Sequence, residues 1–140
     1  SGLVGSEMCI RDRRGPVYYY YLNLLCEKEW MGTRVCTMKM LKTMSIDKLR
    51  QSHQDSWKID NASWHWSFFG DADTVRAKMD AYEHQENNLP QFRDTMEQRI
   101  EAGLDPFGRD YLYQPTVVPI DGSYPDYVQK NKEKLVRFIK

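Results

Sequence analysis

The sequence lacks an excess of charge of either sign, and it lacks long hydrophobic runs. Its 140 residues include 20 Lys and Arg against 20 Asp and Glu, so the formal net charge is zero. This balance argues against general nucleic-acid binding, which needs a basic face to displace counterions from phosphates. The longest stretches without a charged residue are 15–26, 61–70 and 111–120. All are shorter than the ~18–20 apolar residues that span a bilayer, so we expect no transmembrane helix and no secretory signal.

Cysteine is confined to the early part of the chain, which limits the metal sites that the sequence offers. Cys9, Cys26 and Cys36 precede residue 44, so residues 44–140 contain no thiolate for a zinc site. The histidines are spaced too irregularly for a ligand pair on one helix; they are His53, His65 and His84. We therefore assign no metal-binding residue.

Motifs for catalysis and for cofactor binding are also missing. The chain has no glycine-rich phosphate loop and no nucleophile elbow. Asp71-Ala72-Asp73 resembles the start of a calcium loop, but Arg76 stands where the turn glycine is needed and Tyr82 where the bidentate glutamate is needed. We interpret these aspartates as helix caps, and we expect no catalytic residue and no cofactor.

The first residues resemble a laboratory reagent more than a protein. Residues 3–12 read LVGSEMCIRD, which is similar to the translation of a transposase-type sequencing adapter, CTC GTG GGC TCG GAG ATG TGT ATA AGA GAC. The next adapter bases, AG, permit Arg13. The resemblance implies that residues 1–13 are an adapter-derived artefact, so we exclude them from the fold prediction. A natural basic arm is the alternative. We recognise no protein family in the sequence.

Residues 14–43 differ in composition from the rest of the chain. Residues 1–43 carry a net charge of +3, and residues 44–140 carry −3. We therefore expect residues 14–43 to be an untranslated leader or a transit-like segment. From Met31 the chain is basic, hydroxyl-rich and free of acid before Asp47, as mitochondrial transit segments are. A buried aromatic strand at 15–30 and an ordinary helix after Met31 are the alternatives. The candidate start positions are Met31, Met38, Met40 and Met44.

Residues 44–140 predict one small, mainly α-helical domain with a central helical hairpin. Asp71 or Asp73 caps the first hairpin helix, and the second begins at Pro90 and ends at Gly103. Residues 87–89 form the break between them. Apolar side chains at helical spacing predict a common seam, formed by Val75, Met79, Phe92, Met96 and Ile100.

Shorter elements flank this hairpin. Ser45 predicts the cap of a short helix that runs to about residue 56. Bulky residues alternate along 57–70, which favours a strand or an extended aromatic anchor. A last helix is predicted after Pro125, with lysine and arginine crowding its end, where cations suit the helix dipole.

Between the hairpin and the last helix, residues 111–120 predict an extended arm. Pro115 and Pro119 exclude a helix interior and a central strand there. The arm carries apolar and aromatic side chains that would be exposed to water unless another surface covers them. We therefore predict that the arm docks on another chain together with two tryptophans. The predicted partner-binding residues are Trp64, Trp66, Tyr111, Tyr113, Val117, Val118 and Ile120.

The supply of core residues also favours a partner. Residues 44–140 hold 20 Leu, Ile, Val and Phe residues among 97, which is close to the ~20% level below which chains tend to be disordered. The helical stripes carry about one apolar residue per turn, whereas independent helical cores have three or four per two turns. An ordinary small helical domain with an aromatic core is the alternative.

These observations predict a non-catalytic structural or accessory subunit of a larger protein complex. The transit-like composition after Met31 indicates mitochondrial inner-membrane machinery, with the cytoplasm as the other location. Expected partners are other protein subunits and not nucleic acid, with peripheral proximity to a membrane as an option. The alternatives are an enzyme, or enzyme fragment, with an incomplete active site and a soluble adaptor that binds a peptide or phospholipid.

Overall fold

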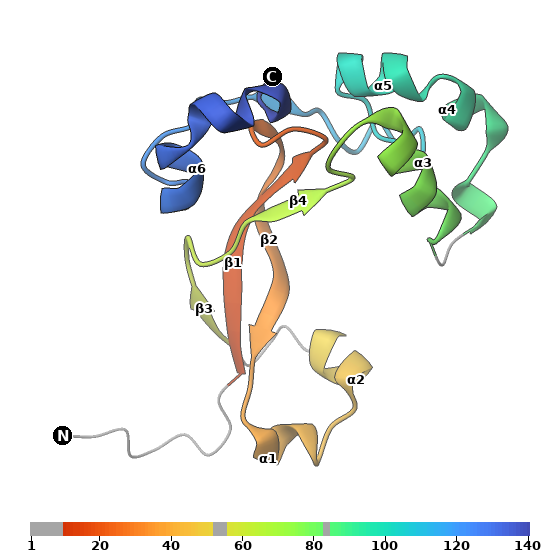
Figure 1. The fold of residues 1–140 in the computed structure, drawn as a ribbon. Helices are drawn as coiled ribbons and strands as arrows, with labels where there is room; N and C mark the ends of the chain where they lie inside the picture. The colour runs from red at the N-terminus through yellow and green to blue at the C-terminus, as the bar shows by residue number, and fades with distance from the viewer. Residues whose placement is uncertain (1–9, 52–55, 83–84) are drawn as a thin grey trace. The chain divides into compact units, whose positions relative to one another are not determined.

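The computed structural model describes residues 10–51, 56–82 and 85–140. They fall into two compact units. Unit 1 extends to Gly15 and includes Glu29–Trp64, and unit 2 comprises Pro16–Lys28 and His65–Lys140. In chain order, the elements are β1 (Ile10–Tyr19), β2 (Leu24–Val35), α1 (Met38–Leu41), α2 (Ile46–Gln51), β3 (Ser56–Ile59), β4 (His65–Ser67), α3 (Ala72–Asp80), η1 (Gln85–Asn87), α4 (Pro90–Asp94), α5 (Met96–Ala102), β5 (Thr116–Val117), α6 (Asp126–Lys130) and η2 (Lys132–Phe138) (Figure 1).

The strands form one mixed sheet. Its order is β3-β1-β2-β5, and β4 also pairs with β1. Both β3 and β4 run parallel to β1, β3 beside Ile10–Arg13 and β4 beside Val17–Tyr19. β5 pairs antiparallel with the start of β2, Val117 opposite Leu24. β1 and β2 therefore provide the pairing surface for every other strand.

The prediction of a mainly α-helical protein was wrong, and so was its description as helical. Of the described residues, strands make up 24% and helices 37%, and the strands form a mixed sheet of five strands. The error has a definite cause, because residues 1–43 were excluded from the fold prediction and they contain β1 and β2. Without these two strands the remaining strands have nothing to pair with, so a sheet could not be predicted.

Unit 1 contains a buried ion pair. The Arg34 Nε atom lies 2.7 Å from Asp12 Oδ1, and Arg34 Nη2 donates to Asp12 Oδ2 at 3.0 Å. The two side chains are 5% and 0% exposed. Arg34 Nη1 also donates to the carbonyl oxygen of Leu49 in α2. One guanidinium group thus connects β1, β2 and α2.

The apolar cluster of unit 1 is small. Met40 of α1 and Leu49 of α2 are buried, and Cys36 and Met44 pack against them partly exposed. Ser45 Oγ accepts a hydrogen bond from Lys48 N at 3.2 Å, which confirms the predicted cap of the short helix. Residues 52–55, where that helix was expected to end, lie outside the described residues, as do residues 1–9.

Unit 2 contains an aromatic core that begins with the tyrosines at the end of β1. Tyr18, Tyr19 and Tyr20 are buried. The Tyr19 ring meets Phe68 edge-on at 5.6 Å, and Phe68 meets Phe107 in the same way at 5.6 Å. The end of β1 is therefore a buried aromatic strand. Edge-to-face packing of this kind adds to the stabilisation from burial.

Three predicted helix boundaries in unit 2 are found, but the first predicted helix ends earlier than expected. α3 ends at Asp80, and the 3-10 helix η1 covers Gln85–Asn87, which includes part of the break expected at 87–89. Asp71 caps α3 by accepting from Thr74 N at 2.9 Å, Pro90 is the first residue of α4, and Gly103 ends α5 in the left-handed conformation with φ +71. The second predicted helix is interrupted at Thr95, which separates α4 from α5. Four predicted seam residues are buried, namely Val75, Met79, Met96 and Ile100, while Phe92 is half-buried.

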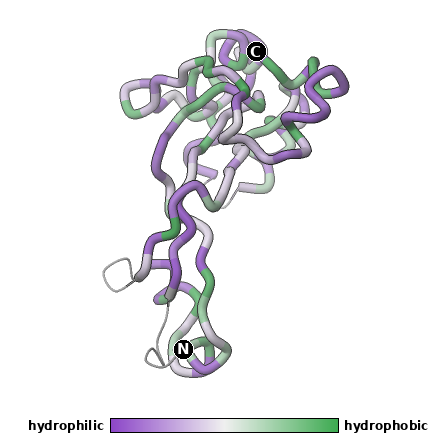
Figure 2. The backbone as a smooth tube through the Cα atoms, turned by 90° about the vertical axis from the view of Figure 1, so that its left-hand side faces the viewer, coloured by the Kyte–Doolittle hydropathy of each residue, from purple (hydrophilic) through white to green (hydrophobic). Residues whose placement is uncertain are grey.

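The last part of unit 2 departs from the prediction in two places. The arm contains a two-residue strand, β5, between Pro115 and Pro119. The single helix expected after Pro125 is divided at Asn131 into the α-helix α6 and the 3-10 helix η2. No helix among the described residues is long and apolar enough to cross a membrane. Hydrophobic stretches alternate with hydrophilic ones along the backbone (Figure 2).

Candidate functional site

The loop between β1 and β2 forms part of the wall of a cavity in unit 2. Tyr20 sits in this loop with a positive φ of 60, a conformation that is uncommon outside glycine. Its backbone N–H donates to Ser67 O at 3.2 Å, and its carbonyl accepts from Gly70 N at 3.2 Å. Its hydroxyl donates to Leu104 O at 2.6 Å. These bonds fix the loop against the β4–α3 turn and the end of α5.

Asn23, in the same loop, ties two later segments together. Its Nδ2 donates to Val118 O at 3.1 Å and to Lys140 O at 3.0 Å, and its Oδ1 accepts from Lys140 N at 2.8 Å. The side chain is buried. Leu22 N adds a bond to Phe138 O at 2.8 Å. The arm and the C-terminal segment are therefore both held by the β1–β2 loop.

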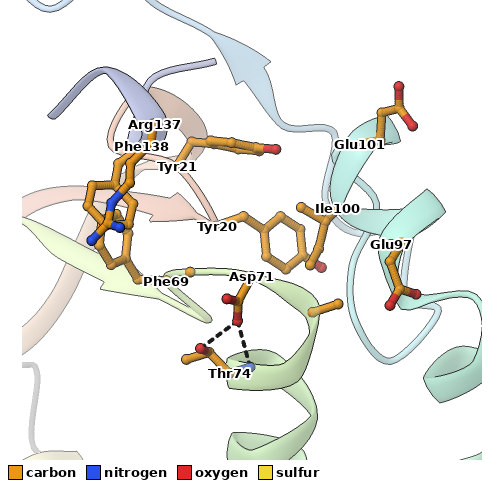
Figure 3. A pocket seen from close by; sticks show the side chains of 12 residues that line it. Tyr20, Tyr21, Phe69, Asp71, Thr74, Glu97, Ile100, Glu101, Arg137 and Phe138 are labelled. Atoms are coloured by element: carbon orange, nitrogen blue, oxygen red, sulfur yellow. Dashed lines mark hydrogen bonds between the residues drawn. The ribbon is translucent and has the colours of Figure 1, made fainter.

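A pocket of about 780 Å³ opens beside this loop. Its walls come from four places: the β1–β2 loop, the β4–α3 turn with the start of α3, one face of α5, and η2 (Figure 3). The lining is mostly aromatic or apolar at its base and charged at its edges. This volume lies within the ~300–1,000 Å³ of typical small-ligand sites. The sequence prediction did not include this site, because half of its aromatic wall comes from residues that had been excluded from the fold prediction.

The charged groups of the pocket are largely engaged with their own neighbours. Hydrogen bonds from Thr74 hold the pKa of Asp71 below its ordinary value. Arg76 binds Glu97 through two hydrogen bonds of 2.7 and 2.8 Å and lowers the pKa of that carboxyl group. These carboxylates are therefore ionised at neutral pH and are poor general bases.

The predicted partner-binding residues of the arm differ in their exposure to solvent. Tyr111 and Val117 are 81% and 54% exposed, and Leu112, which the prediction omitted, is 58% exposed. Tyr113, Val118 and Ile120 are half-buried. The Tyr113 ring lies 6.0 Å from that of Tyr19, and Arg109 stacks over it at 5.3 Å.

The two predicted tryptophans belong to different units. Trp64 is half-buried and belongs to unit 1, whereas Trp66 belongs to β4 in unit 2. The Trp66 ring stacks on Tyr18 at 6.0 Å, and its Nε1 donates to Leu22 O at 3.1 Å. One face of the Trp66 ring and its indole nitrogen thus contact residues of the same unit.

A cluster around Asp105 stabilises the turn before the arm. The buried Asp105 carboxylate accepts from Arg109 Nε at 3.0 Å and Nη2 at 2.9 Å. Its backbone carbonyl accepts from Arg99, whose Nη2 also binds Asp110 at 2.7 Å. These hydrogen bonds lie within α5 and the turn that follows it, so the cluster positions the backbone of the turn.

Cys26 and His65 offer little reactivity at neutral pH. Burial raises the pKa of the Cys26 thiol to about 11, so it stays protonated at neutral pH and is a weak nucleophile. Burial, with a smaller effect from Lys78, lowers the pKa of His65. Among residues 10–51, 56–82 and 85–140, no three His, Cys, Asp or Glu side chains are grouped to hold a metal ion. His53 and His84 lie outside these residues.

Comparisons with known proteins give no further assignment, in agreement with the sequence, in which no family is recognised. No protein-family model, no curated protein and no solved structure matches the chain.

Proposed function

We propose that this protein is a non-catalytic accessory subunit that docks on another protein chain through its arm. The observation that carries the proposal is the exposure of Tyr111, Leu112 and Val117, which are large apolar side chains on one short segment. Exposed apolar side chains that gather on one segment often mark an interaction site, and aromatic residues are frequent anchors there.

The arm is held in place without a partner, which favours tight docking. Val118 N donates to Asn23 O at 2.9 Å, and Val117 pairs with Leu24. Pro115 and Pro119 restrict the backbone on both sides. Pre-ordering lowers the conformational entropy that is lost when the arm binds.

Docking would use side chains and not strand addition. Thr116 and Val118 direct their N–H groups toward β2 in the antiparallel ladder, because Val118 N binds Asn23 O and hydrogen-bonded positions alternate. Proline at 115 and 119 has no N–H to offer. The outer edge of β5 therefore provides Val117 N–H alone, too little for a continued ladder.

The cellular location is part of the proposal and rests on the sequence. The basic, acid-poor segment after Met31 supports mitochondrial inner-membrane machinery as the assembly. An adaptor that binds a peptide or phospholipid is the second candidate, supported by the pocket in unit 2.

The arm can be tested by measuring assembly of the native protein. We expect wild-type protein to co-migrate with its complex on native gels, and the triple variant Tyr111→Ser/Leu112→Ser/Val117→Ser to migrate alone. The matched control changes Tyr127→Ser and Val136→Ser, which are similarly exposed at 67% and 68%. Co-migration of the triple variant, or a wild-type protein that is monomeric in its native source, would overturn the proposal.

A further inference from the structure

The pocket of unit 2 is separate from the arm. None of residues 111–120 lines it, so docking through the arm leaves it open. Its base is formed by side chains that are almost fully buried: Tyr20 is 1% exposed, Ile100 7% and Ala72 8%. The buried aromatic and aliphatic side chains of this base favour an apolar ligand, because burial of apolar surface drives binding.

Aromatic rings form the opposite wall. Phe69 and Phe138 lie 4.9 Å apart at an interplanar angle of 34°, and Tyr21 lies above them in the close view (Figure 3). The bond from Leu22 N to Phe138 O holds this wall to the β1–β2 loop. Aromatic pairs gain energy beyond their buried area, so this wall favours a ring over an aliphatic chain.

The charges at the edge oppose one another. Glu97 and Glu101 stand on the α5 side, and Arg137 stands on the η2 side with its guanidinium carbon 4.5 Å from the Phe138 ring centre (Figure 3). Two further cations contact the α5 side. Arg76 forms an ion pair with Glu97, and Lys140 Nζ donates to the backbone carbonyl of Glu101. Asp71 at the base is bonded to Thr74. A ligand with net charge of either sign meets a repelling group on one wall.

We propose that this pocket binds an uncharged aromatic group, such as a tryptophan or phenylalanine side chain of the partner chain. The inference rests on the proposed function for the identity of the partner, since aromatic side chains are the common anchors of protein interfaces. The pocket then supplies a second contact, beside the arm, for one docked chain.

The test titrates the isolated protein with N-acetyl-tryptophanamide, followed by the NMR amide shifts of Tyr20, Gly70 and Ile100. We expect a Kd on the order of 0.1–1 mM, as the binding efficiency of small ligands allows. N-acetyl-leucinamide, which lacks the ring, should bind several-fold more weakly. The anionic N-acetyl-tryptophan and the cationic tryptophanamide should each bind about threefold or more weakly. Equal binding of all four probes, or shifts confined to other residues, would overturn the proposal.

Matched variants locate the binding site. Ala72→Leu fills the base of the pocket and should weaken binding about tenfold or more. Ala77→Leu makes the same change at an exposed position of α3 and should bind like wild type. Undiminished affinity of a folded Ala72→Leu variant contradicts the proposal.

A second variant keeps the test decisive if Ala72→Leu unfolds the protein. Arg137 is exposed, so Arg137→Gln leaves the fold intact and should bring tryptophanamide up to the affinity of the neutral probe. Lys134→Gln, also exposed on η2, is the control and should leave both affinities unchanged. If Arg137→Gln leaves the preference for the neutral probe unaltered, the charge argument is wrong. A failed titration with intact arm-dependent assembly rejects the pocket alone.

Discussion

Units 1 and 2 are stabilised by different physical means. Among its described residues, unit 1 buries an ion pair between Asp12 and Arg34 and an apolar cluster around Met40 and Leu49. Unit 2 buries tyrosine and phenylalanine rings together with the α3–α5 seam. A buried ion pair contributes little net stability because desolvation offsets the Coulomb attraction, whereas apolar burial is directly favourable. From this comparison we expect unit 1 to be the less stable unit and the more sensitive to the loss of one charge.

The largest effect is expected from a charge placed in the seam of unit 2. Met96 is fully buried against α3, so Met96→Asp loses apolar contacts and buries an unpaired carboxylate. We expect a loss of about 4 kcal/mol or more in the free energy of unfolding. Urea unfolding measures it, with Gln98→Asp on the exposed side of α5 as the control. A change within about 0.5 kcal/mol for Met96→Asp would show that the seam is wrong.

A loss of about 3 kcal/mol is expected in unit 1 when its ion pair is broken by Asp12→Ala, because Arg34 then stays buried without its carboxylate. Residue-resolved hydrogen exchange should place the loss in residues 29–51. The double variant Asp12→Leu/Arg34→Met should recover most of the stability. Asp126→Ala, which removes the exposed pair with Lys130, should leave stability unchanged. Comparable damage from Asp126→Ala and Asp12→Ala would remove the contrast between the units.

Asn23 gives a smaller test, now of hydrogen bonding in unit 2. Asn23→Ala removes three hydrogen bonds to Val118 and Lys140 and leaves the carbonyl groups of both residues with fewer donors. We expect a cost of about 2 kcal/mol and faster amide exchange at Lys140. Asn131→Ala, which loses one exposed bond to Tyr127 O, is the control. Unchanged exchange at Lys140 would mean that Asn23 does not hold this segment.

The smallest effect concerns pH and His65 of unit 2. Because its folded pKa lies below the ordinary value of 6.5, the unfolded chain binds more protons than the folded chain once the pH falls below about 6.5. The contribution of neutral His65 to the free energy of unfolding is fully present above that pH. It decreases as the pH falls toward the folded pKa. The difference between the urea midpoints at pH 7.5 and pH 5.5 should therefore be smaller in His65→Gln than in wild type. An identical pH dependence in both proteins would contradict the assignment.

Local chemistry made the helices of unit 2 predictable from sequence. The Asp71 cap, the Pro90 start and the Gly103 stop each act within one turn of helix, and all three are found. The seam followed from spacing alone. The interruption at Thr95 was not predicted, because neither proline nor glycine marks it.

Non-local pairing made the sheet and the pocket unpredictable. β1 pairs with β3 and β4 over separations that no local signal records, and the adapter-like and leader-like composition removed β1 and β2 from consideration. Tyr20 and Asn23 acquire their roles through bonds to Leu104 and Lys140, far along the chain. The arm was recognisable from its prolines, and Tyr111 and Val117 in it are exposed; its docking on another chain stays a prediction.

The bond between Asn23 and Lys140 joins residues 117 positions apart. Closing so long a loop has a high entropic cost before any contact compensates for it, and folding rates fall as contacts become less local. The β1–β2 hairpin and the α3–α5 pair can form early from nearby residues. The closure at Asn23 is then expected to come last, so the arm and η2 remain undocked, with apolar groups accessible, for most of the folding time.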